Sequence, residues 1–162
     1  MRRIFIAVAA VCLCAAAASA QTKVSGTAQF GKPDPSHMVP VGDRPDHNMG
    51  VEQLKCTWTK PMEIGGDKAK DGVSTETLDV SANMGRARGV HVTTMESGDK
   101  YFVSYQGTAT YKDGAAAELK GTWGFNGGTG KLKGIKGKGT YTCAPAGDAL
   151  SCEIEGEYTL AK

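Results

Sequence analysis

The chain is poor in the residues that usually carry catalysis. Aromatic residues make up 7% of its 162 positions, and it has three histidines and two tryptophans. Three histidines offer few of the pairings with an acid or a nucleophile that general-base catalysis needs. No serine–histidine–acid or cysteine–histidine pairing has a local signature. Beyond residue 20, no window longer than about ten residues places apolar residues at helical spacing, which excludes a helical bundle.

The chain also lacks long apolar runs, apart from one at the N-terminus. Met1-Arg2-Arg3 is a charged start, residues 4–18 are apolar, and Ala18-Ser19-Ala20 supplies the small residues of a cleavage site before Gln21. The run of about 15 residues is shorter than the roughly 20 that span a bilayer. The sequence therefore predicts a cleaved secretory signal peptide over residues 1–20 and a periplasmic or secreted protein with no lipid anchor.

Once residues 1–20 are removed, the chain also has no excess of positive or negative charge. Without residues 1–20 the chain has 142 of its 162 residues, and because Arg2 and Arg3 are removed, 17 basic residues balance 17 acidic ones. This balance argues against a nucleic-acid binder and against a protein inserted in or held to a membrane. The length suits a single domain over residues 21–162.

Glycine and period-two alternation are what the sequence has in abundance. It contains 22 glycines, and its alternating runs of apolar and polar residues are separated by Gly, Asp and Asn turns such as Asp113-Gly114. The pattern predicts eight strands, at residues 22–30, 51–59, 73–84, 85–95, 100–111, 117–125, 131–143 and 149–160. The predicted fold class is therefore all-β and antiparallel, with one face of each strand in the core.

The last two strands can be paired residue by residue if Cys143 and Cys152 form a disulfide. The other pairs are then Tyr141–Ile154, Gly139–Gly156, Gly137–Tyr158 and Ile135–Leu160 on one face, and Lys138–Glu157, Thr140–Glu155 and Thr142–Glu153 on the other. A slip by one residue would move the charged face into the core. An exported protein permits disulfides. The remaining cysteine, Cys56, is expected to be a buried, inert apolar residue.

Residues 121–141 (GTWGFNGGTGKLKGIKGKGTY) resemble the Gly-Gly-Thr-Gly-Lys-x-x-Gly hairpin of the allene oxide cyclase and dirigent barrel superfamily. They also resemble small exported bacterial proteins of unknown function that carry this hairpin, and the strand at residues 98–109 fits the same pattern. The resemblance implies an eight-stranded antiparallel β-barrel with a central apolar cavity, assembled into dimers or trimers. It assigns no catalytic residue to this chain.

Residues 31–50 (GKPDPSHMVPVGDRPDHNMG) hold four of the six prolines and two of the three histidines. They are expected to form a long loop over one mouth of the barrel. Together with neighbouring Met and Asp residues, His37 and His47 offer ligand types that bind copper or zinc in exported proteins. Because the spacing of the two histidines matches no defined metal motif, no metal or other cofactor is predicted.

The candidate site consists of inward-facing aromatic and basic residues. The aromatic residues on the apolar face of their strands are Trp58, Tyr105, Trp123 and Tyr141. They are expected to line a binding cavity, with ordinary core packing as the alternative. In the strand at residues 85–95, either His91 points inward or Arg86 and Arg88 do, where they would bind a carboxylate of the ligand. We expect His91 to be exposed.

Three functions are compatible with this sequence. The first is a non-catalytic barrel that binds a small apolar or amphipathic ligand, and the second is a cyclase- or dirigent-like enzyme that steers a reactive intermediate. The third is a structural or interaction barrel filled by its own side chains. An eight-stranded barrel is either just filled or holds one small ligand. Because Leu, Ile and Phe are few and the inward positions are rich in Gly, Ala and Val, the sequence favours a cavity and the first function.

Overall fold

The computed structural model describes residues 21–112 and 115–161. The predicted signal peptide, residues 1–20, and the predicted turn at Asp113-Gly114 lie outside the described residues. The described residues form ten strands and one 3₁₀ helix, η1 (Gly130–Leu132). Among them, no helix is long and apolar enough to cross a membrane.

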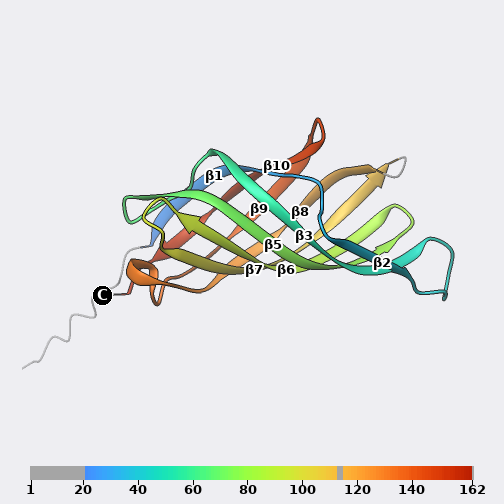
Figure 1. The fold of residues 1–162 in the computed structure, drawn as a ribbon, viewed down its shortest axis with the longest axis horizontal. Coiled ribbons are helices and arrows are strands. Elements are labelled where there is room, and N and C mark those ends of the chain that lie inside the picture. The colour runs from blue at the N-terminus through green and yellow to red at the C-terminus, as the bar shows by residue number, and fades with distance from the viewer. Residues whose placement is uncertain (1–20, 113–114, 162) are drawn as a thin grey trace, which may run out of the picture.

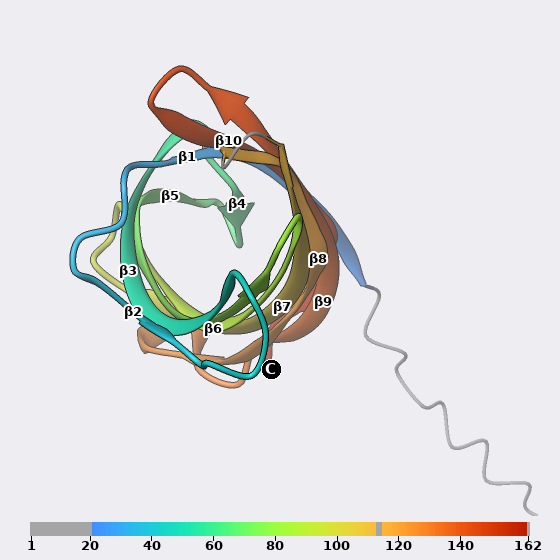
Figure 2. The same ribbon diagram turned by 90° about the vertical axis from the view of Figure 1, so that its right-hand side faces the viewer.

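Eight of the strands form a closed antiparallel ring, which confirms the predicted fold class (Figures 1 and 2). They are β1 (Thr22–Phe30), β3 (His47–Lys60), β5 (Asp67–Ser81), β6 (Met84–Met95), β7 (Lys100–Lys112), β8 (Ala115–Gly128), β9 (Lys136–Ala146) and β10 (Ala149–Thr159). Consecutive strands pair from β5 to β10, β10 pairs with β1, and β1 pairs with β3. The pairing of β3 with β5 closes the ring.

Alternation along each strand separates the core from the outer surface. In β7, Tyr101, Val103 and Ala109 are buried, whereas the intervening Ser104 and Gln106 are exposed. This is the parity that the sequence predicts, because successive side chains of a strand point to opposite faces of a sheet. The inward-facing residues of all eight ring strands meet inside the barrel.

The final hairpin adopts the predicted register. Cys143 is paired with Cys152, Tyr141 with Ile154 and Gly139 with Gly156. The two cysteines form a disulfide, and both are buried. A single register therefore places the disulfide and the aromatic residues inside and the Lys–Glu and Thr–Glu pairs outside.

The predicted loop over residues 31–50 is wrong for most of its length. β2 (Ser36–Pro40) pairs with the first residues of β3, from Asn48 to Glu52, so the segment is a hairpin that extends the barrel wall. β1 and β2 lie along the same side of β3, and residues 31–35 join them. Because the sequence alternates poorly here and holds four prolines, its pairing depends on β3 and not on its own pattern.

The predicted strand at 131–143 begins later than expected. Residues 130–132 form η1 instead, and β9 starts at Lys136. The turn allows both Leu132 and Ile135 to be buried although they have opposite strand parity.

The two ends of the barrel are filled differently. Large apolar side chains pack at one end. The short strand β4 (Glu63–Ile64) lies over this end (Figure 2). They include Met62, Ile64, Met95, Tyr101, Leu132 and Ile135. Elsewhere, small inward residues such as Ala87 and Ala109 leave the interior unfilled.

Candidate functional site

A cavity of about 460 Å³ occupies the interior of the barrel, and all eight ring strands contribute to its wall. Met62 and Tyr101 of the packed end form its floor. Its lining is mostly apolar and aromatic, with a few polar groups, which is the usual composition of a small-molecule site. The alternative of a barrel filled by its own side chains does not fit this interior.

The cavity opens to solvent at the end of the barrel where residues 31–33 and the turn that joins β9 to β10 lie side by side. Phe30, Gly147 and Leu150 contribute to this opening. On this rim, the Nζ of Lys32 lies 3.6 Å from Oδ2 of Asp148. Both side chains are largely exposed, so this ion pair contributes little to stability. The segment after β1 therefore forms part of the rim, as the sequence predicts for residues 31–50.

Three of the four predicted aromatic residues line the cavity: Tyr105, Trp123 and Tyr141. The rings of Tyr105 and Tyr141 are perpendicular, with centroids 6.1 Å apart. Burial raises the pKa of both phenols, so both hydroxyls are neutral. The Tyr141 hydroxyl is buried and has no hydrogen-bond partner among the described residues; it lies against Gly107 and Gly121 in the barrel wall.

Trp123 lies between the cavity and the barrel wall. It is 7% exposed, and its Nε1 donates a hydrogen bond to the carbonyl oxygen of Thr140 at 3.2 Å. Its six-membered ring rests on the paired glycines Gly139 and Gly156, where a Cβ would approach Cζ2 to 2.6 and 2.5 Å. Glycine is required at both positions because any side chain would displace the indole.

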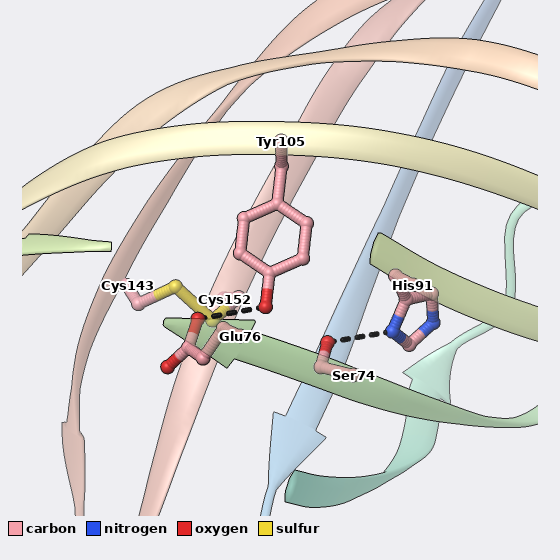
Figure 3. The surroundings of a disulfide bond; sticks show 6 residues. All are labelled: Ser74, Glu76, His91, Tyr105, Cys143 and Cys152. Atoms are coloured by element: carbon pink, nitrogen blue, oxygen red, sulfur yellow. Dashed lines mark hydrogen bonds between the residues drawn. A yellow bond between two sulfur atoms is a disulfide. The ribbon is translucent and has the colours of Figure 1, made fainter. Parts of the chain in front are cut away.

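A buried carboxyl group is the most unusual polar feature of the cavity. Glu76 of β5 is 8% exposed, and Oη of Tyr105 donates a hydrogen bond to its Oε2 at 2.7 Å (Figure 3). Burial raises the pKa of Glu76 to about 7; the Tyr105 hydrogen bond opposes this shift, and the charge of Glu52 adds to it. Glu52 is the cross-strand partner of Glu76 and also lines the cavity.

His91 is buried, which corrects the expectation that it is exposed. It is 7% exposed, and its Nδ1 lies 2.8 Å from Oγ of Ser74 on the neighbouring strand (Figure 3). Its Nε2 lies 3.8 Å from Sγ of Cys56, and Phe30 packs edge-on against its ring. Burial lowers the pKa of His91 to about 4, so the imidazole is neutral near pH 7.

Cys56 is a free, buried thiol, as the sequence predicts. Burial is the main cause that raises its pKa to about 12, and the charge of Asp71 adds to this. A thiol that stays protonated is a poor nucleophile. The disulfide Cys143–Cys152 also lies in the cavity wall, near Glu76 and Tyr105 (Figure 3).

The other predicted site residues lie elsewhere. Trp58 packs against the core, with its ring next to Gly26, and is not among the residues that line the cavity. Arg86 borders the cavity, but it is exposed, as is Arg88 on the outer face of the barrel. The buried residues of β6 are the alternate ones, which include His91. Of the two parities that the sequence leaves open, β6 thus adopts the one that turns His91 inward, with Arg86 at the border of the cavity.

Glu76 and Ser74 are the functional candidates that the sequence prediction missed. Both share the strand parity of Leu78, which the sequence places on the inward face. The signal was thus present, because both lie within the predicted strand at residues 73–84, but polar side chains at inward positions do not by themselves indicate a binding site.

The two histidines of residues 31–50 do not form a metal site with each other. His37 is exposed on β2, whereas His47 is buried between Asp43 and Asp79, with Nε2 3.0 Å from Oδ1 of Asp79. Within residues 21–112 and 115–161, no group of three or more His, Cys, Asp or Glu side chains is arranged to hold a metal ion.

Comparisons with known proteins place the chain by its fold alone. No protein-family model matches it, and no curated protein matches its sequence. Among solved structures, it is similar to a conserved protein of unknown function from Rhodopseudomonas palustris, with a TM-score of 0.55 and 8% identity over 85% of this chain and 98% of the other. It is also similar to a pyocyanin demethylase, with a TM-score of 0.44 and 14% identity over 82% and 98% of the two chains. The first likeness supports the barrel fold.

Proposed function

We propose that this protein is a small exported β-barrel that binds one small apolar or amphipathic molecule inside the barrel, without catalysing a reaction. The observation that carries the proposal is the open cavity of about 460 Å³ with its mostly apolar and aromatic lining. Its volume lies within the usual range of about 300–1,000 Å³ for small-molecule sites. Three sequence-predicted aromatic residues contribute large apolar surfaces to its wall.

Titration with N-phenyl-1-naphthylamine, a neutral apolar dye that fluoresces when it leaves water, tests the proposal. We expect saturable binding of one dye per chain. Replacing Ala109, which lines the cavity, with phenylalanine places a ring in the space that the dye needs and should weaken binding at least about tenfold. Dye fluorescence at increasing protein concentration gives the dissociation constants of the unmodified protein and of the Ala109→Phe variant.

The matched control is Thr110→Phe, which adds the same ring at the next residue, on the exposed face of β7. It should bind the dye like the unmodified protein. The proposal fails if the unmodified protein shows no saturable binding, or if the two variants bind the dye equally well.

A second candidate is an enzyme of the allene oxide cyclase or dirigent type, although the resemblance to that superfamily assigns no catalytic residue to this chain. The observation that favours it is a protonatable carboxyl, Glu76, hydrogen-bonded to the Tyr105 hydroxyl inside the cavity. The glycine-rich hairpin at residues 121–141 and the closed eight-stranded ring support membership of that superfamily. Turnover of a bound molecule by the unmodified protein, lost in Glu76→Gln, would favour this function over simple binding.

Export is part of the proposal, and it rests on the N-terminal signal pattern and on the buried disulfide Cys143–Cys152. Disulfides persist mainly in oxidising compartments outside the cytosol. We expect protein recovered from the periplasm or the medium to begin at Gln21. Intact-mass spectrometry of that material measures this directly, and a retained Met1 would contradict export by a cleaved signal peptide.

A further inference from the structure

The carboxyl group of Glu76 is buried in the cavity wall without a positively charged partner. Its hydrogen bond from Tyr105 uses one of the roughly four lone-pair positions of a carboxylate. Among the described residues, no ion pair involves Glu76, although six other ion pairs are present. A buried carboxylate is costly unless a charge or hydrogen-bond donors compensate it.

The groups around Glu76 do not supply that compensation. Glu52 of β3 has the same sign of charge and faces it across the strand pair. From β6, His91 is neutral, and Arg86 is exposed at the border of the cavity. The phenols that face it from β7 and β9, those of Tyr105, Tyr111 and Tyr141, have pKa values raised by burial and are also neutral. Lys32 lies at the mouth, where it is paired with Asp148. The cavity interior therefore carries more negative than positive charge.

The aromatic lining of the cavity is suited to a positive charge as well. The ring faces of tyrosine and tryptophan are negative and attract cations within about 6 Å of the ring centre. Tyr105 and Tyr141 stand at right angles with centroids 6.1 Å apart, and Tyr111 and Trp123 line the same cavity. An arrangement of two or more such rings next to a carboxylate is chemically complementary to an amine.

We propose that the ligand of this cavity is a small organic cation, a protonated or quaternary amine on an apolar body, whose positive charge lies against Glu76 and the tyrosine rings. This inference rests on the proposed function and specifies its ligand class. The apolar walls bind the body of the molecule, and Glu76 selects its charge. An inorganic cation stripped of its water shell does not fit, because the lining supplies few further oxygen ligands to replace the waters.

The proposal predicts that binding depends on pH in a definite direction. The cation requires the ionised carboxyl, whereas the pKa of Glu76 in the unliganded protein is about 7. Protonation therefore competes with the cation below that pH. Affinity should be nearly constant above pH 8 and fall about tenfold between pH 8 and pH 6. His91, with a pKa of about 4, does not titrate in this range.

The test compares phenyltrimethylammonium with tert-butylbenzene, which has the same shape and no charge. Each is titrated against protein carrying N-phenyl-1-naphthylamine, and dye displacement gives the affinity. At pH 8 we expect the cation to bind at least about tenfold more tightly than the neutral compound. Glu76→Gln should remove this difference and the pH dependence, while leaving the affinity for tert-butylbenzene unchanged. The control Glu155→Gln, on the exposed face of β10, should behave like the unmodified protein.

The outcomes separate this inference from the proposed function. If the dye and tert-butylbenzene bind but the cation binds no more tightly at pH 8, the inference is wrong and the proposed function stands. If neither the dye nor either compound binds, the proposed function is wrong. The pH series on the unmodified protein does not depend on the folding of a variant, and a cation affinity that is the same at pH 6 and pH 8 overturns the role of Glu76.

Discussion

Replacing Trp123 with alanine is expected to lower the free energy of unfolding by about 3–5 kcal/mol. The indole is 7% exposed, stacks on Gly139 and Gly156, and packs edge-on against Phe125 with centroids 5.1 Å apart. Alanine would remove these contacts and the Nε1 hydrogen bond, and the two glycines offer no side chain that could fill the space. Chemical denaturation followed by circular dichroism measures the change.

The control is Thr122→Ala, the neighbouring exposed residue on the outer face of β8, which should change stability by less than about 0.5 kcal/mol. Because Trp123 also lines the cavity, its alanine variant should bind N-phenyl-1-naphthylamine more weakly as well. A stability loss no larger than that of the control would contradict the packing described for Trp123.

Removing the Cys143–Cys152 disulfide is expected to destabilise the protein by about 2–3 kcal/mol, which corresponds to a fall of roughly 6–10 °C in melting temperature. The bond joins residues nine positions apart, and its main effect is to limit the freedom of the unfolded chain. The variant Cys143→Ala/Cys152→Ala tests this by calorimetry. A melting temperature within about 2 °C of the unmodified protein would contradict the prediction.

A reductant provides the control for this experiment. It should lower the melting temperature of the unmodified protein once thiol titration shows that the bond is reduced. It should leave the double variant unchanged, because Cys56 is then the remaining cysteine of the described residues and is already a free thiol.

The final hairpin shows what the sequence can predict about this fold. The alternation in β10 is strict, and pairing Cys143 with Cys152 sorts both faces of two strands at once. The inward positions of Tyr105, Trp123 and Tyr141 follow from the same alternation. These predictions hold because each rests on several residues that agree, so that a slip by one position would expose many apolar side chains.

The polar interior could not be predicted in the same way. In β6, each of the two parities places polar groups inside, so the strand alone does not decide between His91 and the arginines. Ser74 on β5, Cys56 on β3 and Phe30 at the end of β1 supply the contacts that His91 makes in the core. Phe30 and Cys56 come from strands that are far from β6 in sequence, and the barrel brings them together with His91.

The prediction of a loop over residues 31–50 failed for a related reason. Their prolines and weak alternation predict a loop, yet β2 pairs with an extension of β3 that begins at His47. The buried His47, held by Asp43 and Asp79, anchors the turn end of this hairpin. Pairing with a neighbouring strand thus overrides the local preference of the segment.

The cavity itself results from where small and large residues fall along the barrel. Methionine, isoleucine and leucine fill the end covered by β4, whereas Ala87 and Ala109 line the rest of the interior. The composition of the sequence favours a cavity, but its position and its opening near Lys32 require the strand register.

The most direct test of the binding account is a crystal structure of the protein grown with N-phenyl-1-naphthylamine. We predict one dye molecule inside the barrel, with its rings against Trp123 and Leu78 and its amine toward the tyrosine hydroxyls. An interior filled by the protein's own side chains, with the dye absent or bound to the outer face, would contradict the account.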